Sequence, residues 1–147
     1  MNFSRVLIVC TGNICRSPVA EALLKARLPH MTIESAGLGA LVDHGIEPTA
    51  RSLAEGDGLT VAEHKARQVT EDMILRADLV LVMSEGQRQA VAKLVPSATG
   101  KTMLFGRWLG QGGKGEEIPD PYRKSPEAFQ HVHRQLVRAA DSWASKL

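Results

Sequence analysis

Unbroken apolar runs alternate with helical patterns along this chain. The first run, Val6 to Cys10, is rich in β-branched side chains and predicts a strand buried on both faces. Further strands are predicted at residues 32–35, 78–83 and 102–105, and helices from Ser17, over 48–55 and 85–94, and from Ser125. This alternation predicts a parallel sheet with helices on both faces. We therefore expect one Rossmann-like α/β domain over residues 1–147, with four parallel strands.

The predicted helices at the two ends of the chain have clear apolar faces. Ser17-Pro18 opens the first with a proline where its missing N–H does no harm, and Val19, Leu23 and Ala26 form its apolar face. A glycine-rich loop at 110–115 comes before the last helix, which begins at Ser125-Pro126. The apolar stripe of that helix consists of Phe129, Val132, Leu136, Ala140 and Trp143. Between these residues, His131 and His133 are expected to be solvated or packing residues.

Composition and charge exclude several classes of protein. The net charge is +2 and no long basic run occurs, so neither nucleic acid nor an anionic membrane is an expected partner. No apolar stretch is long enough to cross a bilayer, and the first residues lack a secretory signal pattern. Cys10 and Cys15 are the only cysteines, which excludes a disulfide framework and fits a reducing compartment. We expect a cytoplasmic monomer without cofactor or metal.

The segment from Cys10 to Ser17 joins the first predicted strand to the first predicted helix, where α/β folds bind ligands. Gly12 and Asn13 are able to adopt positive φ, so the loop can direct its backbone N–H groups toward one point. The N-terminus of the following helix adds further N–H groups and the positive end of its dipole. Arg16 adds a planar guanidinium that can bind two oxygens at once. The loop therefore predicts a binding site for phosphate or a similar dianion.

Cys10 lies at the start of this loop, where the same positive field would stabilise its thiolate. A thiolate beneath a bound phosphate predicts in-line attack and a phosphocysteine intermediate, with Ser17 as a hydrogen-bond donor to the sulfur. A lone cysteine is more often a packing residue, but Cys10, five residues and then Arg16-Ser17 between strand and helix favour a nucleophile. Two interpretations of Cys15 stay open: a packing residue, or a thiol that traps oxidised Cys10 as a disulfide.

Four segments of the chain match the motifs of one known family, and they occur in the same order as in that family. They are Val6 to Pro18 (VLIVCTGNICRSP), Glu34 to Gly37, His64 to Gln68, and Asp120 to Tyr122. Together they resemble the low-molecular-weight protein tyrosine phosphatases over nearly the whole chain. A Pro-Asp-Pro segment alone would indicate only a turn. The resemblance implies a phosphatase for phosphotyrosine with Asp120 in its active site.

The resemblance also implies a role for each residue of the site. Cys10 would be the nucleophile, Arg16 the clamp of the transition state, and Asp120 first a general acid and then the base for water. Asn13, Ser17, Ser35 and His64 would form a polar network that holds the loop in shape. The substrate would contact Thr11, Gly12, Asn13, Ile14, Cys15, Ser17, Leu41 and Tyr122, with Tyr122 stacked on its ring.

Within the family, Leu38 to Val42 and Ile118 to Ser125 resemble the bacterial capsule and exopolysaccharide group, which is Wzb-like. Leu41 stands where an aromatic wall residue would be expected, and Arg123 follows Tyr122 where a second tyrosine is usual. The resemblance implies that the partner is a bacterial tyrosine autokinase that controls polysaccharide export.

Three other functions are compatible with parts of the pattern. An arsenate reductase of this fold would need further cysteines after residue 80, and the chain has none after Cys15. A cysteine phosphocarrier would accept phosphate without hydrolysing it, whereas Arg16 and Asp120 favour hydrolysis. A phosphotyrosine-binding module without activity would have no need for Cys10.

Overall fold

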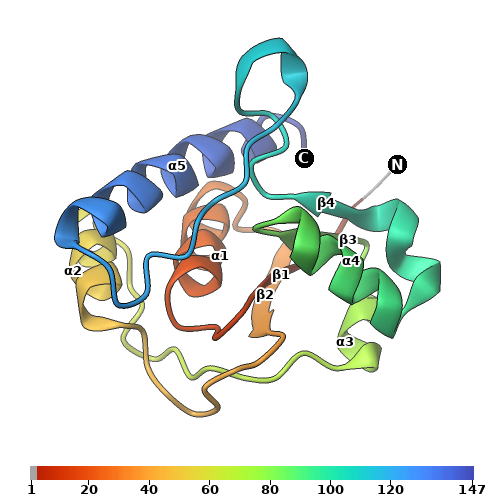
Figure 1. The fold of residues 1–147 in the computed structure, drawn as a ribbon, viewed down its shortest axis with the longest axis horizontal. Helices are drawn as coiled ribbons and strands as arrows, with labels where there is room; N and C mark the ends of the chain where they lie inside the picture. The colour runs from red at the N-terminus through yellow and green to blue at the C-terminus, as the bar shows by residue number, and fades with distance from the viewer. Residues whose placement is uncertain (1–2) are drawn as a thin grey trace.

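A four-stranded parallel sheet runs through the centre of the protein, which is described here over residues 3–147 by a computed structural model (Figure 1). The strand order is β2-β1-β3-β4, and all three neighbouring pairs are parallel. The strands are β1 (Arg5–Cys10), β2 (Thr32–Gly37), β3 (Leu79–Val82) and β4 (Thr102–Leu104). The predicted α/β fold is confirmed. Met1 and Asn2, which the predicted domain includes, lie outside the described residues.

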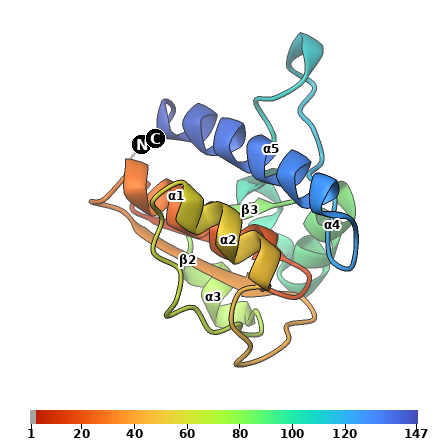
Figure 2. The ribbon, with the colours of Figure 1, turned by 90° about the vertical axis from the view of Figure 1, so that its left-hand side faces the viewer.

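Helices cover both faces of the sheet (Figures 1 and 2). One face carries α1 (Arg16–Arg27), α2 (Pro48–Gly56) and α5 (Pro126–Ala144), and the other carries α3 (Glu71–Arg76) and α4 (Glu85–Leu94). Because successive side chains of a strand point to opposite faces, Ile8 packs with the first group and Val9 with the second. Ile8 and Val9 are both fully buried, as the unbroken apolar run of β1 predicts.

Side-chain caps define where the later helices begin, and α1 differs from them. Ser84 Oγ accepts from the Gln87 N–H at the start of α4, and Ser125 Oγ accepts from the Ala128 N–H at the start of α5. Among residues 3–147, no side chain caps α1, whose preceding residue is Cys15. The first N–H groups of α1 therefore have no side-chain acceptor and are available to bind an anion held by the adjoining loop.

Several elements differ from the sequence-based expectations. Helix α3 and two 3₁₀ turns, Pro96–Lys101 and Gln111–Gly113, were not predicted. In α1 the buried stripe is centred between Leu23 and Leu24, which turns Ala26 to its exposed edge. The prediction that Ala26 belongs to the apolar face of this helix is therefore wrong. In α5, all five residues of the predicted apolar stripe are buried.

His133 packs as expected and also makes a polar contact that the sequence did not predict. Its Nε2 lies 2.6 Å from Asp57 Oδ2, so the side chain joins α5 to the residue that ends α2. His131 is exposed, as expected.

The segment between β4 and α5 leaves the body of the protein as a loop and returns to the sheet, as Figures 1 and 2 show. The base of the loop is closed by a hydrogen bond from the Glu116 N–H to the Gly106 carbonyl, at 2.9 Å. The Ile118 N–H then donates to the Met83 carbonyl at the end of β3, also at 2.9 Å. This contact fixes the start of the segment that carries Asp120. None of the helices formed by the described residues is both long and apolar enough to cross a membrane.

Candidate active site

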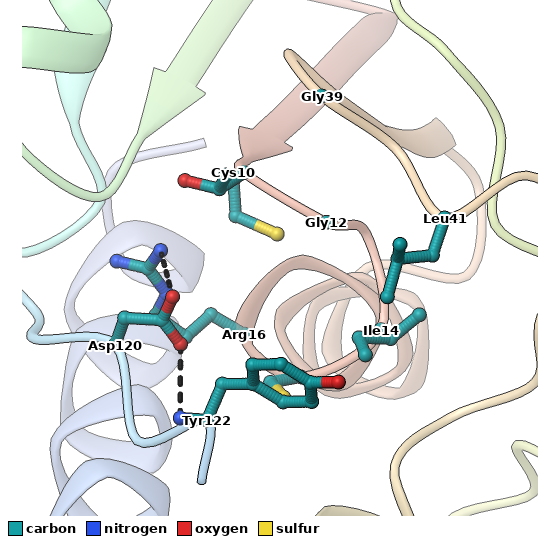
Figure 3. Close-up of a pocket in the computed structure, with 10 residues that line it drawn as sticks. Cys10, Gly12, Ile14, Arg16, Gly39, Leu41, Asp120 and Tyr122 are labelled. Atoms are coloured by element: carbon teal, nitrogen blue, oxygen red, sulfur yellow. Dashed lines mark hydrogen bonds and ion pairs between the residues drawn. The ribbon is translucent and has the colours of Figure 1, made fainter.

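A pocket with a cavity of about 170 Å³ opens at the carboxyl end of β1. The residues that line it come from the loop after β1, the loop after β2 and the segment before α5: Cys10, Thr11, Gly12, Ile14, Cys15, Arg16, Gly39, Leu41, Asp120 and Tyr122. Figure 3 shows the Cys10 sulfur directed into this ring of side chains, with Arg16 and Asp120 on one side and Ile14 and Leu41 on the other. The pocket thus brings together residues that are more than 100 positions apart in the sequence.

Asn13 determines the shape of the loop that follows Cys10. Its φ is +59°, whereas Gly12, which the sequence also allows to adopt positive φ, does not do so. The Asn13 side chain accepts a hydrogen bond from the Arg67 N–H at 3.0 Å and donates to Ser17 Oγ at 2.8 Å and to Ser35 Oγ at 3.0 Å. Every hydrogen-bonding atom of this buried amide is therefore used, which stabilises a conformation that non-glycine residues rarely adopt.

His64 holds the same loop through the backbone. Its Nε2 lies 2.6 Å from the Asn13 carbonyl oxygen. Because a carbonyl oxygen can only accept, Nε2 carries the proton. The four residues of the expected polar network, Asn13, Ser17, Ser35 and His64, are thus in direct contact around Asn13.

The direction of the hydrogen bonds near the nucleophile follows from the Asn13 amide nitrogen, which can only donate. Ser17 Oγ lies 2.8 Å from Cys10 Sγ. Since Ser17 Oγ already accepts from the Asn13 amide, its own hydrogen is available for the sulfur. Ser35 Oγ likewise accepts from Asn13 and donates to Glu21 Oε1 at 2.6 Å. A chain of hydrogen bonds therefore leads from the Glu21 carboxylate to the Cys10 sulfur.

The segment after β2 supports the loop from the other side. The Gly39 N–H donates to the Thr11 carbonyl and the Leu41 N–H to the Gly12 carbonyl, each at 3.0 Å. This close approach requires glycine at position 37, because a Cβ there would lie 2.4 Å from the Thr11 carbonyl oxygen. The carbonyl oxygens of Thr11 and Gly12 are occupied in this way.

Arg16 is buried beside Cys10, with only 5% of its side chain exposed. Its Nη1 donates to the Ile118 carbonyl at 2.8 Å, while the buried Nε has no partner among the described residues. The remaining group, Nη2, lies 3.7 Å from Asp120 Oδ2. A buried N–H without an acceptor is costly, and the edge formed by Nε and Nη2 suits two oxygens of one anion.

Asp120 and Tyr122 close the pocket on the side of α5. The Asp120 side chain is 48% exposed, and its Oδ1 accepts from the Tyr122 N–H at 3.0 Å. Because the other oxygen faces Arg16, this half-exposed carboxyl group lies at the edge of the pocket. The Tyr122 ring, together with Ile14 and Leu41, gives the pocket apolar walls.

The two cysteines of the site have different surroundings. Both are free and buried. Burial, together with the negative charges of Asp120 and Glu47, raises the pKa of the Cys15 thiol to about 12. Cys15 is therefore a neutral thiol at physiological pH, and it lines the pocket.

Three supporting residues were not identified from the sequence: Glu21, Arg67 and Gln87. Gln87 Nε2 donates to Thr11 Oγ1 at 3.2 Å, and Gln87 Oε1 accepts from the Met83 N–H at 2.8 Å. Arg67 belongs to the segment His64 to Gln68, but its contact with Asn13 is made by the backbone N–H, which no side-chain pattern reveals. Glu21 and Gln87 occupy helical positions that are ordinarily solvated, so only the three-dimensional arrangement identifies them.

Comparison with known proteins gives consistent matches over the whole chain. A family model described as "Low molecular weight phosphotyrosine protein phosphatase" matches residues 5–147. The low molecular weight protein-tyrosine-phosphatase Etp of Escherichia coli K12 is 46% identical over 147 residues, which cover 100% of this chain and 97% of Etp.

Two solved structures share the fold closely. Wzb from Escherichia coli K30, a tyrosine phosphatase crystallised in complex with sulphate, is 46% identical with a TM-score of 0.93 and covers 99% of either chain. Wzb from Vibrio vulnificus, in complex with benzylphosphonate, is 41% identical with a TM-score of 0.93 and covers 99% of this chain and 100% of its own. The chain therefore belongs to the low molecular weight phosphotyrosine protein phosphatases, and it is a protein-tyrosine-phosphatase of the Wzb and Etp type.

Proposed function

We propose that this phosphatase transfers the phosphoryl group of phosphotyrosine to Cys10 and then hydrolyses the resulting phosphocysteine. One observation carries the proposal: Cys10 Sγ lies 2.8 Å from the Ser17 hydroxyl in a pocket where the buried Arg16 Nε has no acceptor from residues 3–147. A nucleophile and an unused anion-binding group therefore face the same space. The sulphate bound by Wzb of Escherichia coli K30 supports a tetrahedral anion as the missing partner.

In the first step the Cys10 thiolate attacks phosphorus and the bond from phosphorus to the phenolic oxygen breaks. The electron pair of that bond goes to the oxygen, which takes a proton from the Asp120 carboxyl group. Arg16 binds two of the phosphoryl oxygens through Nε and Nη2 while negative charge develops on them. Tyrosine leaves with its phenol protonated.

In the second step Asp120, now a carboxylate, takes a proton from a water molecule that attacks the phosphocysteine. The sulfur–phosphorus bond breaks and its electron pair returns to Cys10 Sγ, where the Ser17 hydroxyl stabilises the thiolate. Inorganic phosphate is released, and the enzyme is ready for a further cycle. The proton lost by Asp120 in the first step is regained in the second.

The pocket walls favour an aromatic phosphate over an aliphatic one. Ile14, Leu41 and Tyr122 offer apolar surface on the path from solvent to Cys10. The tyrosine ring can bury itself against these walls, whereas phosphoserine has no group to fill the space. Benzylphosphonate, which Wzb from Vibrio vulnificus binds, has an aromatic ring one methylene group away from its phosphorus and supports this preference.

We extend the proposal to the physiological setting. The substrate is the phosphotyrosine of a bacterial autokinase that controls capsule or exopolysaccharide export, and the phosphatase acts on it as a cytoplasmic monomer. The support is the resemblance of Leu38 to Val42 and Ile118 to Ser125 to that group, together with the Wzb relatives. A reduced Cys10, which the chemistry requires, is maintained in the cytoplasm.

The proton donor is tested by comparing two leaving groups. Asp120→Asn is expected to lower kcat/KM by about 100-fold or more for phenyl phosphate, whose leaving group needs a proton, and by less than about 10-fold for 4-nitrophenyl phosphate. Equal losses for the two esters would exclude Asp120 as the acid. Mass spectrometry of the enzyme after acid quenching should locate the phosphoryl group on Cys10.

The same experiment separates hydrolysis from phosphate transfer. A phosphocarrier would form phosphocysteine once and release no phosphate until an acceptor was added. Steady release of inorganic phosphate into water supports the proposed second step. A phosphoryl group found on any residue other than Cys10 would contradict the proposed first step.

A further inference from the structure

Arg123 occupies an unusual backbone conformation beside the catalytic pocket. Its φ is +63°, in the left-handed region, and the turn around it is closed by the Lys124 N–H donating to the Pro121 carbonyl at 2.9 Å. The third residue of such a turn is ordinarily glycine or asparagine. A long side chain held in this conformation is the kind of backbone outlier that concentrates at functional sites.

This turn places the Arg123 guanidinium at the rim of the pocket. Its Cζ lies 5.2 Å from the centre of the Tyr122 ring, and Tyr122 lines the pocket (Figure 3). A guanidinium stacked on an aromatic ring uses one face for that contact, while the N–H groups at its edge stay available. Arg123 therefore presents hydrogen-bond donors next to the wall against which the substrate ring packs.

Within residues 3–147, no carboxylate forms an ion pair with the Arg123 guanidinium. Over residues 3–147, the Arg123 guanidinium takes part only in the ring contact, and the Lys124 ammonium makes no ion pair. The nearby Asp120 carboxylate is directed to Arg16 and to the Tyr122 N–H instead. Three other exposed arginines do pair with carboxylates: Arg51 with Glu55, Arg67 with Glu34, and Arg76 with Asp72.

The opposite rim has a different character. Leu41 lines the pocket there and is partly exposed, and the next residue in the chain, Val42, is apolar and 55% exposed. A peptide whose phosphotyrosine enters the pocket would thus meet unpaired positive charge on one side and apolar surface on the other.

We propose that Arg123 selects substrates with a carboxylate side chain, aspartate or glutamate, next to the phosphotyrosine. This inference rests on the proposed function, because it concerns the peptide that surrounds the hydrolysed group. Two parallel N–H groups at the guanidinium edge bind both oxygens of such a carboxylate, while stacking on Tyr122 keeps the guanidinium in place. Arg123 is a specificity residue and takes no part in the chemical steps.

Two phosphotyrosine peptides that differ only in charge test the proposal. One has glutamate on both sides of the phosphotyrosine, and the other has glutamine at the same positions. Because the ion pair between Arg123 and the substrate glutamate is exposed to solvent, its contribution is small. The wild type should therefore prefer the glutamate peptide about three- to fivefold in kcat/KM. Arg123→Asn should reduce this ratio to about one, since asparagine tolerates the left-handed conformation but carries no charge. Any effect of the substitution on the packing of Tyr122 acts on both peptides equally and therefore cancels in the ratio of their kcat/KM values.

Lys124→Gln is the matched control, because it removes the neighbouring positive charge without touching the stacked guanidinium. It should keep most of the preference for glutamate. A wild type without preference, a preserved ratio in Arg123→Asn, or an equal loss in Lys124→Gln would overturn the proposal. If no phosphotyrosine peptide is hydrolysed by any of the three proteins, the proposed function itself fails.

Discussion

At the scale of single residues, the hydrogen bonds around Asn13 have only one possible direction. The Asn13 amide donates to both Ser17 and Ser35, so each of these hydroxyls must send its own hydrogen elsewhere. For Ser17 the acceptor is the Cys10 sulfur, and for Ser35 it is the Glu21 carboxylate. The proton arrangement that stabilises a thiolate at Cys10 is therefore maintained from Glu21, a residue that does not line the pocket.

Glu21→Gln should weaken this arrangement without removing the site. An amide at position 21 can donate to Ser35, which allows Ser35 and Asn13 to turn and withdraw the Ser17 hydrogen from the sulfur. We expect kcat to fall by about three- to tenfold, because one charge-assisted hydrogen bond is lost at a distance from the reacting atoms. The inhibition constant of inorganic phosphate should stay close to the wild-type value, since Arg16 and the loop N–H groups are unchanged.

Lys25→Met is the control for this variant. Lys25 Nζ contacts the other oxygen of Glu21 at 2.6 Å, and its removal leaves the bond to Ser35 in place. It should therefore preserve kcat. A wild-type kcat in Glu21→Gln, or an equal fall in both variants, would show that the direction of the hydrogen bonds does not matter for turnover.

At the scale of elements, the site depends on how closely the loop after β1 and the end of β2 approach each other. Gly37, the last residue of β2, pairs with Cys10, and its own N–H donates to the Arg67 carbonyl. This packing links the phosphate-binding loop, β2 and the segment that carries His64 and Arg67. Any side chain at position 37 would separate them.

Gly37→Ala should disrupt both stability and activity. The added Cβ would lie 2.4 Å from the Thr11 carbonyl oxygen and 3.1 Å from the Asn13 nitrogen, so the loop must move. We expect a loss of about 1–3 kcal/mol in the free energy of unfolding, measured with denaturant, and a fall in kcat. Gly100→Ala, where nothing lies within 4 Å of the new Cβ, should change stability by less than about 0.5 kcal/mol. Unaltered kinetics in Gly37→Ala would mean that this approach does not shape the loop.

The elements differ in how well the sequence predicts them. The apolar runs that became β1 and β3 were recognised because both faces of these strands are buried, which leaves no polar residue inside the run. The six residues of α3 escaped prediction because only Met73 and Ile74 are buried, too few to establish a helical period. Ala26 was assigned to the wrong face because a small apolar residue is tolerated on either side of a helix.

At the scale of the whole molecule, the site is a meeting point of distant segments. Residues 10–17 form a continuous motif, so the phosphate-binding loop could be predicted from local sequence. Asp120 was placed in the site only through the family resemblance, because a loop more than 100 residues away has no local signal that it returns to β1. Its position follows from the hydrogen bond between Ile118 and Met83 at the end of β3.

The hydrolysis of phosphotyrosine by Cys10 is tested most directly with two phosphopeptides that differ only at the phosphorylated position, which is phosphotyrosine in one and phosphoserine in the other. Phosphate release by the wild type and by Cys10→Ser would be measured with a chelator present. We predict steady release from the phosphotyrosine peptide by the wild type, little from the phosphoserine peptide, and none by Cys10→Ser, which should still bind phosphate. Turnover that survives in Cys10→Ser, or that the chelator abolishes in the wild type, would contradict a mechanism based on this cysteine.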